Sequence, residues 1–174
     1  MDLLTYFKAE IETVGRQWKE TIAPLDEISA RRRPRNNVNH ALWLTGHMIW
    51  AEDYLLVEVP SGSTFRSKEW DYFFDHSSEK LPDDEYPPWG EVRAEYTVVH
   101  EKAMKHLARL NQGDMRRPSF LERQWFPSAA HSIAHQVTHG HYHLGQLVYL
   151  SRQLAPAGAP STLDALLKAG ARGN

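Results

Sequence analysis

The residues with the clearest chemical meaning in this sequence are histidines, and half of them lie close together. Five of the ten fall within thirteen residues: His131, His135, His139, His141 and His143. Side chains four residues apart on a helix share one face, with Cβ atoms about 5–6 Å apart. Two such imidazoles can bind one metal ion through bonds of about 2.0–2.1 Å. The cluster therefore predicts a metal site on a helix.

Spacing leaves several histidine pairs open as ligands. The pairs separated by four residues are His131 with His135, His135 with His139, and His139 with His143. His141 points to the opposite side of the helix and is not expected to join them. Because two imidazoles on one helix form a weak site, a third ligand should come from a facing helix.

An earlier helical segment supplies two candidates for that third ligand, His40 and His47. They are seven residues apart, which places them on one helical face but about 10 Å apart along the axis. Only one of them can therefore bind the same ion as a pair from the later helix. Spacing alone does not choose between them.

The histidine-rich helix also has the apolar residues of a core-forming helix. These residues are Ile133, Val137, Leu144, Leu147 and Leu150. Burying several unpaired imidazoles is costly, and a metal ion removes that cost. The competing interpretations are core histidines that pack with ordinary hydrogen bonds, or a loose metal binder without a specific site.

The elements that must position these histidines are four segments with helical periodicity. They cover about residues 2–25, then from Asn36 or Asn37 to about Val57, then 89–111 and 127–154. Such a pattern predicts an all-α four-helix bundle, formed by a single domain of residues 1–174.

Apolar stripes support this assignment. The first helix has Leu4, Phe7, Ile11, Val14, Trp18 and Ile22, and the third has Val92, Tyr96, Val99, Ala103, Leu107 and Leu110. The second helix is expected to have a stripe of His40, Leu44, His47, Ala51, Tyr54 and Leu55, and to end at Pro60. Spacings of three and four residues place each set on one helical face.

The connections carry further expectations. Residues 61–88 look irregular and aromatic, with a possible short helix at 68–74, and they either cover the bundle or act as a lid. This connection is long enough to cross the bundle, so up-down-up-down order is not required. The basic run at 31–35 is either a solvated link or an anion-binding patch. A short helix is expected at 161–169.

Composition excludes several classes of protein. The formal charge is −2, which gives no reason to expect a nucleic-acid partner, and no cysteine is present to form disulfides or thiolate sites. The chain shows neither a signal peptide nor the ~20 apolar residues of a membrane span. We therefore expect a cytoplasmic protein without a membrane partner.

Two motifs resemble those of the DinB/YfiT-like family. The first is the stretch Leu44–Asp53 around His47, and the second is His139–Leu147, in which two histidines four apart precede a Gly-Gln pair. The resemblance covers nearly the whole chain, including Pro160-Ser161-Thr162. It implies a four-helix bundle with a metal site formed by three histidines.

The resemblance also assigns roles to individual histidines. It implies that His47, His139 and His143 are the metal ligands, and it leaves His40, His131 and His135 as residues that pack or support the ligands.

The chain departs from the family pattern at two positions. Family members often have a second histidine and an arginine just before the Gly-Gln pair, where this chain has Tyr142 and Leu144. A substrate anion contact through that arginine is therefore not expected here.

The resemblance implies a homodimer that binds zinc or nickel; iron, manganese or cobalt also suit such a site. Three histidine ligands leave an open position for a bound thiol or water. The implied function is a metal-dependent transferase that joins a low-molecular-weight cellular thiol to a small electrophile. The alternatives are a metal-dependent hydrolase, or a non-catalytic metal-stabilised binding module in a stress response.

Three other polar residues are candidates for the site. Gln146, one turn beyond His143, is the candidate catalytic residue, where it would orient a ligand or bound water; the alternative is a packing hydrogen bond. Glu52 and Asp53 would orient an imidazole or lie at a solvated helix end. Tyr54 is expected in the core.

Overall fold

The computed structural model describes residues 2–35, 38–77 and 81–154, and within these ranges the fold is all-helical, as predicted. The elements are α1 (Leu3–Ile22), α2 (Glu27–Arg31), α3 (Ala41–Asp53), the π-helix η1 (Tyr54–Glu58), α4 (Val59–Ser61), α5 (Glu69–Phe74), α6 (Trp89–Arg109), α7 (Gln112–Met115) and α8 (Ala129–Leu154). The helix expected at 161–169 lies outside the described residues, and the start expected at Asn36 or Asn37 for the second long helix is wrong, because α3 begins at Ala41.

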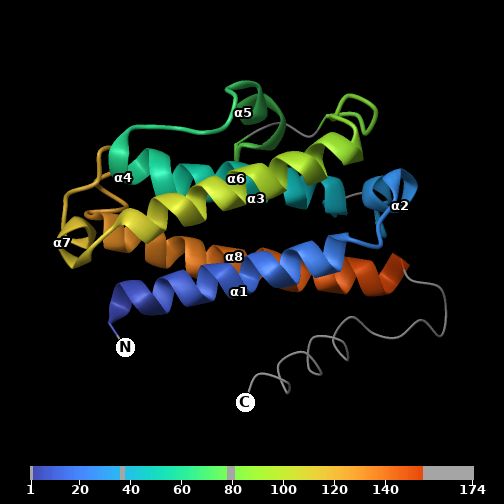
Figure 1. The fold of residues 1–174 in the computed structure, drawn as a ribbon. Coiled ribbons are helices and arrows are strands. Elements are labelled where there is room, and N and C mark those ends of the chain that lie inside the picture. Colours follow the sequence, from blue (N-terminus) through green and yellow to red (C-terminus); the bar gives the residue numbers. More distant parts are fainter. Residues whose placement is uncertain (1, 36–37, 78–80, 155–174) are drawn as a thin grey trace, which may run out of the picture.

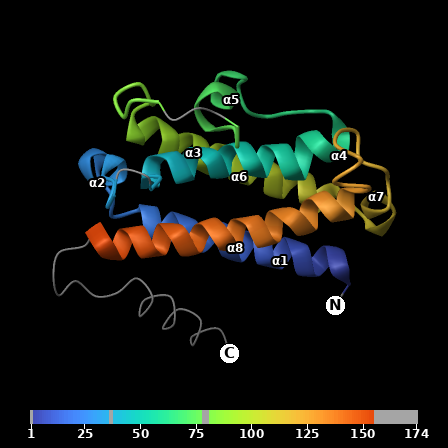
Figure 2. The ribbon, with the colours of Figure 1, turned by 180° about the vertical axis from the view of Figure 1, so that it is seen from behind.

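The long helices form two layers. α1 lies beside α8, and α3 lies beside α6, as Figures 1 and 2 show from opposite sides. In Figure 1, α1 and α8 run in one direction while α3 and α6 run in the other. The connection between α3 and α6 returns along the length of the bundle, so the order is up-down-down-up, and the crossing connection considered from the sequence is present.

α1 and α6 bury the apolar faces that their periodicity predicts. All six stripe residues of α1 are buried, and so are the α6 residues Val92, Tyr96, Val99, Ala103 and Leu107. Asp2 is the N-cap of α1, and its carboxylate accepts a hydrogen bond from the Thr5 amide at 2.9 Å. The sixth α6 candidate, Leu110, follows the end of that helix and is only partly buried.

α3 differs from the prediction, because it is buried on nearly every side rather than along one stripe. Of its thirteen residues only Trp43 is not fully buried. The helix begins at Ala41, with His40 as its N-cap: the Nδ1 of His40 accepts from the Trp43 amide at 2.8 Å. A helix enclosed by α5, α6 and α8 has no solvated face.

The helical path continues beyond α3, first as η1 and then as α4, and its last helical residue is Ser61, close to the end predicted at Pro60. A π-helix has a wider turn, and such turns are frequent at functional sites. The carbonyl of Leu55 in this wider turn accepts a hydrogen bond from the hydroxyl of Ser132 on α8. The path ends at Gly62, whose φ of 75° lies in the left-handed region that glycine adopts without strain.

The connection from residue 62 to residue 88 covers α3, as one of the two interpretations predicts. α5 forms within it, and its Phe74 is fully buried over Gly46. A Cβ atom on Gly46 would lie 2.3 Å from the Phe74 ring, so only glycine permits this approach. The aromatic ring therefore closes over the middle of α3.

The basic run is neither a solvated link nor a free anion-binding patch. Arg31 donates hydrogen bonds to the carbonyls of Tyr86 at 3.2 Å and Pro87 at 3.0 Å. Arg33 pairs with Asp83 at 2.8 Å. Two of the arginines thus bind the loop that precedes α6.

A buried guanidinium joins this connection to α3. Arg66 lies 2.6 Å from the carboxylate of Asp53 and 2.8 Å from those of Glu58 and Asp71. The Arg66 and Asp53 side chains are 5% and 0% exposed, so both charges depend on each other for compensation. Asp53 also accepts from the Phe65 amide at 2.8 Å.

Replacing Arg66 should destabilise the fold strongly. Arg66→Met leaves the Asp53 carboxylate buried without its cation, and we expect a loss of about 3 kcal/mol in the free energy of unfolding. Urea denaturation measures this loss. The matched control is Arg16→Met, which removes an exposed 3.8 Å pair with Glu20 and should cost less than about 0.5 kcal/mol. Equal effects of the two variants would contradict the assigned role.

Candidate metal centre

Three imidazoles from two facing helices meet at one point. His47 comes from α3, and His139 and His143 come from α8. The Nε2 atom of His139 lies 3.2 Å from that of His47 and 3.1 Å from that of His143. Two ligands of a tetrahedral ion with bonds of ~2.1 Å lie about 3.4 Å apart. All three ligand atoms lie within 4.8 Å of one another, so the group could hold a metal ion.

The orientation of His47 is determined by its other ring nitrogen and by two aromatic rings. Its Nδ1 lies 2.8 Å from the carbonyl oxygen of Phe74, which can only accept, so Nδ1 carries the proton and Nε2 keeps its lone pair. The ring stacks between Trp43 and Trp50, with centroids 4.7 and 5.7 Å away. His47 is therefore held as a ligand-ready tautomer.

His143 is oriented in the same manner by a side chain on its own helix. Its Nδ1 donates to the Oε1 atom of Gln146 at 2.9 Å, which leaves the lone pair on Nε2. The third imidazole, His139, has a buried Nδ1 without a hydrogen-bond partner among the described residues. Its Nε2 faces the other two.

The electrostatics of the triad favour neutral rings. Burial, together with the neighbouring imidazoles, lowers the pKa of His47 to about 4 and that of His139 to about 3. Burial also lowers the pKa of His143, against the hydrogen bond to Gln146. All three are therefore neutral at neutral pH, which is the state that binds metals.

Proton counting shows that the donor set fits a metal. If His139 carries its proton on Nε2, it can donate to only one of the two facing lone pairs, and its Nδ1 acceptor is buried and unpaired. If the proton is on Nδ1, three lone pairs face one another. The protein alone satisfies neither arrangement, whereas a cation accepts all three lone pairs.

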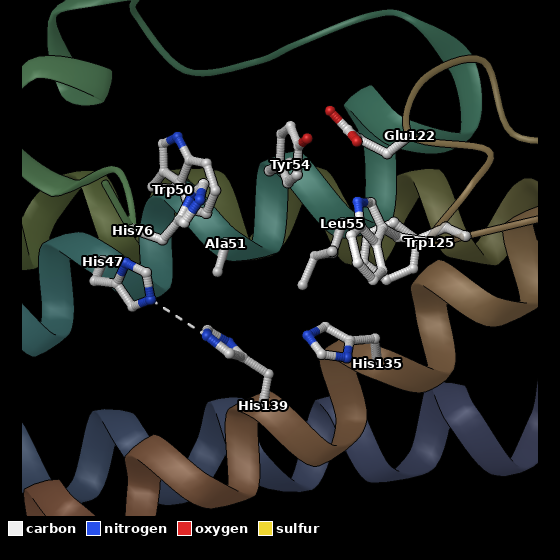
Figure 3. Close-up of a pocket in the computed structure, with 11 residues that line it drawn as sticks. His47, Trp50, Ala51, Tyr54, Leu55, His76, Glu122, Trp125, His135 and His139 are labelled. Carbon is white, nitrogen blue, oxygen red and sulfur yellow. Dashed lines mark hydrogen bonds between the residues drawn. The ribbon is translucent and has the colours of Figure 1, made fainter. Parts of the chain in front are cut away.

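A cavity of about 560 Å³ lies beside two of these histidines. Figure 3 shows His47 and His139 at one end, with the side chains of α3 and η1 on one side and those of α8 on the other. The residues lining it are His47, Trp50, Ala51, Tyr54, Leu55, His76, Glu122, Trp125, Phe126, His135 and His139. Its walls are mainly aromatic and aliphatic, as in small-molecule sites.

The far end of the cavity is formed by the loop that precedes α8. Glu122 has a φ of 51°, the single left-handed non-glycine residue in the described part of the chain. Its carbonyl accepts from the amides of Trp125 at 2.9 Å and Phe126 at 2.8 Å, which closes a tight turn. Strained residues of this kind are concentrated at functional sites.

Comparison with known families assigns the chain. The family model of the DinB superfamily matches residues 10–147, which include all three histidines of the triad. The chain belongs to the DinB superfamily. A crystal structure of a conserved protein from Enterococcus faecalis has the same fold, with a TM-score of 0.65 at 14% identity, over 88% of this chain and 98% of that one. Among curated proteins none matches the sequence.

The other histidines of this DinB-superfamily chain lie outside the triad. His40 caps α3, His131 lies 2.9 Å from the Ser128 hydroxyl, and His141 lies 3.0 Å from a Glu10 carboxylate oxygen on the opposite side of α8. His135 lines the cavity and stacks on the His139 ring with centroids 6.0 Å apart. His40 and His131 therefore have structural contacts of their own.

Two acidic residues differ from their predicted role. Glu52 and Asp53 are buried rather than solvated, and neither contacts the triad. Glu52 does hold an imidazole, but it is that of His100, at 2.9 Å. Burial alone would lower the pKa of His100, and the adjacent carboxylate outweighs this effect and raises it. Because α3 is enclosed, its acidic residues pair with groups of α6 and of the following loop.

Sequence reasoning missed several residues of the site. The Phe74 carbonyl is a backbone group, which no side-chain pattern reveals. Glu122 and Trp125 line the cavity, but they come from a segment without a chemical motif, and Trp50 lies in the motif around His47 without a predicted role. No helix among the described residues is long and apolar enough to cross a lipid bilayer.

The depressed pKa values predict acid sensitivity of the metal-free protein. In the unfolded chain these histidines have a pKa of about 6.5 and take up protons below that pH, whereas the native triad stays neutral. The free energy of unfolding therefore falls as the pH drops from about 6.5 toward the lower pKa values of the folded protein. We expect His139→Leu to reduce the stability lost between about pH 7 and pH 5 by about 1–2 kcal/mol.

Urea denaturation in a chelator at both pH values measures this difference. Thr138→Ala, an exposed neighbour on α8, is the control and should leave the pH dependence unchanged. An identical loss in His139→Leu and in the unaltered protein would contradict the assignment of a neutral buried imidazole.

Proposed function

We propose that this protein is a metal-dependent enzyme in which His47, His139 and His143 hold one divalent ion, and that it transfers a low-molecular-weight thiol to a small electrophile. The convergence of three neutral imidazole nitrogens within 4.8 Å, beside a cavity of about 560 Å³, carries this proposal. Membership of the DinB superfamily supports it. Zinc or nickel is the expected ion, and iron, manganese or cobalt would also suit imidazole ligands.

A divalent ion held by neutral ligands keeps its charge, attracts a soft or anionic donor and lowers the pKa of a thiol or water bound to it. The residues of the chain supply the rest. Phe74 and Gln146 hold the proton of His47 and of His143 away from the site, at 2.8 and 2.9 Å. Gln146 is in this role a positioning residue, and direct contact with a substrate stays a prediction.

The cavity favours catalysis over a purely structural staple. A structural site is closed by a fourth protein ligand, whereas the described residues offer only the three histidines as a group. The cavity volume lies within the range of small-molecule sites. Trp50, Tyr54 and Phe126 provide apolar walls that exclude water from a reacting group.

Two further expectations belong to this proposal. The protein is expected to act in the cytoplasm, and to form a homodimer. Tyr142 and Tyr149 support an interface on α8, because they are 64% and 61% exposed and lie seven residues apart on one helical face.

Metal binding should depend on each member of the triad. In protein purified without a histidine tag, we expect one equivalent of metal in the unaltered chain and at least a tenfold loss of affinity in His47→Ala, His139→Ala and His143→Ala. Elemental analysis and competition with a chromogenic chelator measure this. His141→Ala, on the opposite side of α8, is the control that should keep the full equivalent. Full metal content in all three variants would remove the proposed site.

The reaction itself requires a substrate panel. We expect the metal-loaded protein to accelerate the transfer of small cellular thiols to an electrophile such as 1-chloro-2,4-dinitrobenzene, and chelation to abolish the acceleration. The rate is measured from the absorbance of the thioether product, in which the thiol sulfur has replaced the chloride that leaves the ring. Turnover of esters or amides in place of thiols would favour the hydrolase. Stoichiometric metal without turnover on either panel, together with a metal-dependent rise in Tm, would favour the non-catalytic module.

A further inference from the structure

The cavity beside the triad has two chemically different ends. One end holds His47 and His139 of the triad, and the other holds Glu122, the single residue with a fixed charge among those that line the cavity. Figure 3 shows the Glu122 carboxylate turned toward Tyr54, with the Trp125 indole on the same side of the cavity. The far end thus combines aromatic residues with a carboxylate, whose Oε2 accepts a hydrogen bond from the Gln124 amide at 2.8 Å.

The potential at this far end is negative. Burial, followed by the carboxylates of Glu122, Glu58 and Asp75, raises the pKa of Tyr54 to about 12, and only Arg66 acts in the opposite direction. The Arg66 side chain is 5% exposed and lies between Asp53 and Asp71, so it does not neutralise Glu122. The carboxylates at this end of the cavity would therefore attract a bound cation.

Aromatic side chains, which can bind organic cations, line this part of the cavity. Trp50 stacks on Tyr54 with centroids 4.7 Å apart, and Trp125 is 74% exposed at the cavity mouth. An ammonium group of low charge density gains from such rings, and a nearby carboxylate adds to the gain. An inorganic cation would need several oxygen ligands, which one carboxylate does not supply.

The fold maintains this arrangement against local strain. Glu122 has a φ of 51°, a left-handed backbone conformation that is strained for a residue with a side chain. The loop is nevertheless attached on both sides of Glu122. The Val59 carbonyl accepts from the amides of Phe120 at 2.8 Å and Leu121 at 3.1 Å, and the Phe126 ring packs against the core.

We propose that Glu122, Tyr54 and Trp125 form a subsite for a substituted ammonium group, and that the small-molecule substrate carries such a group. The identification of this group as part of the substrate rests on the proposed function, in which the opposite end of the same molecule meets the three-histidine site. The subsite itself is a property of the cavity and does not need the metal.

The test uses choline and its uncharged isostere 3,3-dimethylbutan-1-ol as probes of the full-length, metal-free protein. Isothermal titration should show choline binding about tenfold more tightly than the alcohol. Glu122→Gln should remove this preference. Glu85→Gln, an exposed glutamate on another loop, is the charge-matched control and should keep it. Equal binding of the two probes, or an unchanged preference in Glu122→Gln, would overturn the proposal.

Two further variants keep the test independent of folding. Glu122→Gly removes the carboxylate and also relieves the left-handed strain, so its loss of choline binding cannot come from a less stable fold. Trp125→Leu should weaken choline roughly tenfold, while Trp125→Phe should retain most of the affinity. Choline affinity that is unchanged in Glu122→Gly or in Trp125→Leu counts against the subsite.

His143→Ala separates this inference from the proposed function. This variant should lose metal and still bind choline with unchanged affinity. Choline binding without any metal binding in the unaltered protein would contradict the metal-dependent enzyme and leave the subsite standing. Metal-dependent thiol transfer without preference for choline over the alcohol would support the enzyme and contradict the ammonium subsite.

Discussion

The position of two protons determines the chemistry of this protein. His47 and His143 each donate Nδ1–H to an oxygen that cannot donate in return, the Phe74 carbonyl and the Gln146 amide. Their Nε2 lone pairs are therefore directed at His139. Because burial keeps all three rings neutral, protonation does not relieve the crowding of lone pairs. A bound cation is the simplest partner that does.

The enclosure of α3 explains why these contacts are possible. A helix covered on one side by α6 and on another by α8 and α5 can place His47 away from solvent and still direct it at the neighbouring helix. The same enclosure forces every charged residue of α3 to find a buried partner, as Glu52 does with His100 and Asp53 with Arg66. The covering loop thus stabilises the fold and supplies the Phe74 carbonyl to the site.

The sequence predicts the helices well, because their apolar stripes depend on short-range spacing. The stripes of α1 and α6 follow from the 3.6-residue period, which also places His139 and His143 on one face but leaves the pairs His131–His135 and His135–His139 equally open. The burial and the partners of Glu52 and Asp53 do not follow from the helical period, because they depend on which elements enclose α3. The cavity wall at Glu122 and Trp125 is likewise a consequence of loop conformation, which no periodic pattern encodes. The preference for His47 over His40 came from family resemblance, and the N-cap position of His40 supplies its physical reason.

The positions of the three histidines along the chain determine when the complete triad can form during synthesis. His47 and His139 are separated by 92 positions, and both α8 ligands belong to the last helix of the described fold. A nascent chain that still lacks α8 offers only one imidazole of the triad, which has little affinity for metal in competition with cellular chelators. In the proposed metal centre, capture of the ion therefore requires that the ribosome has released α8.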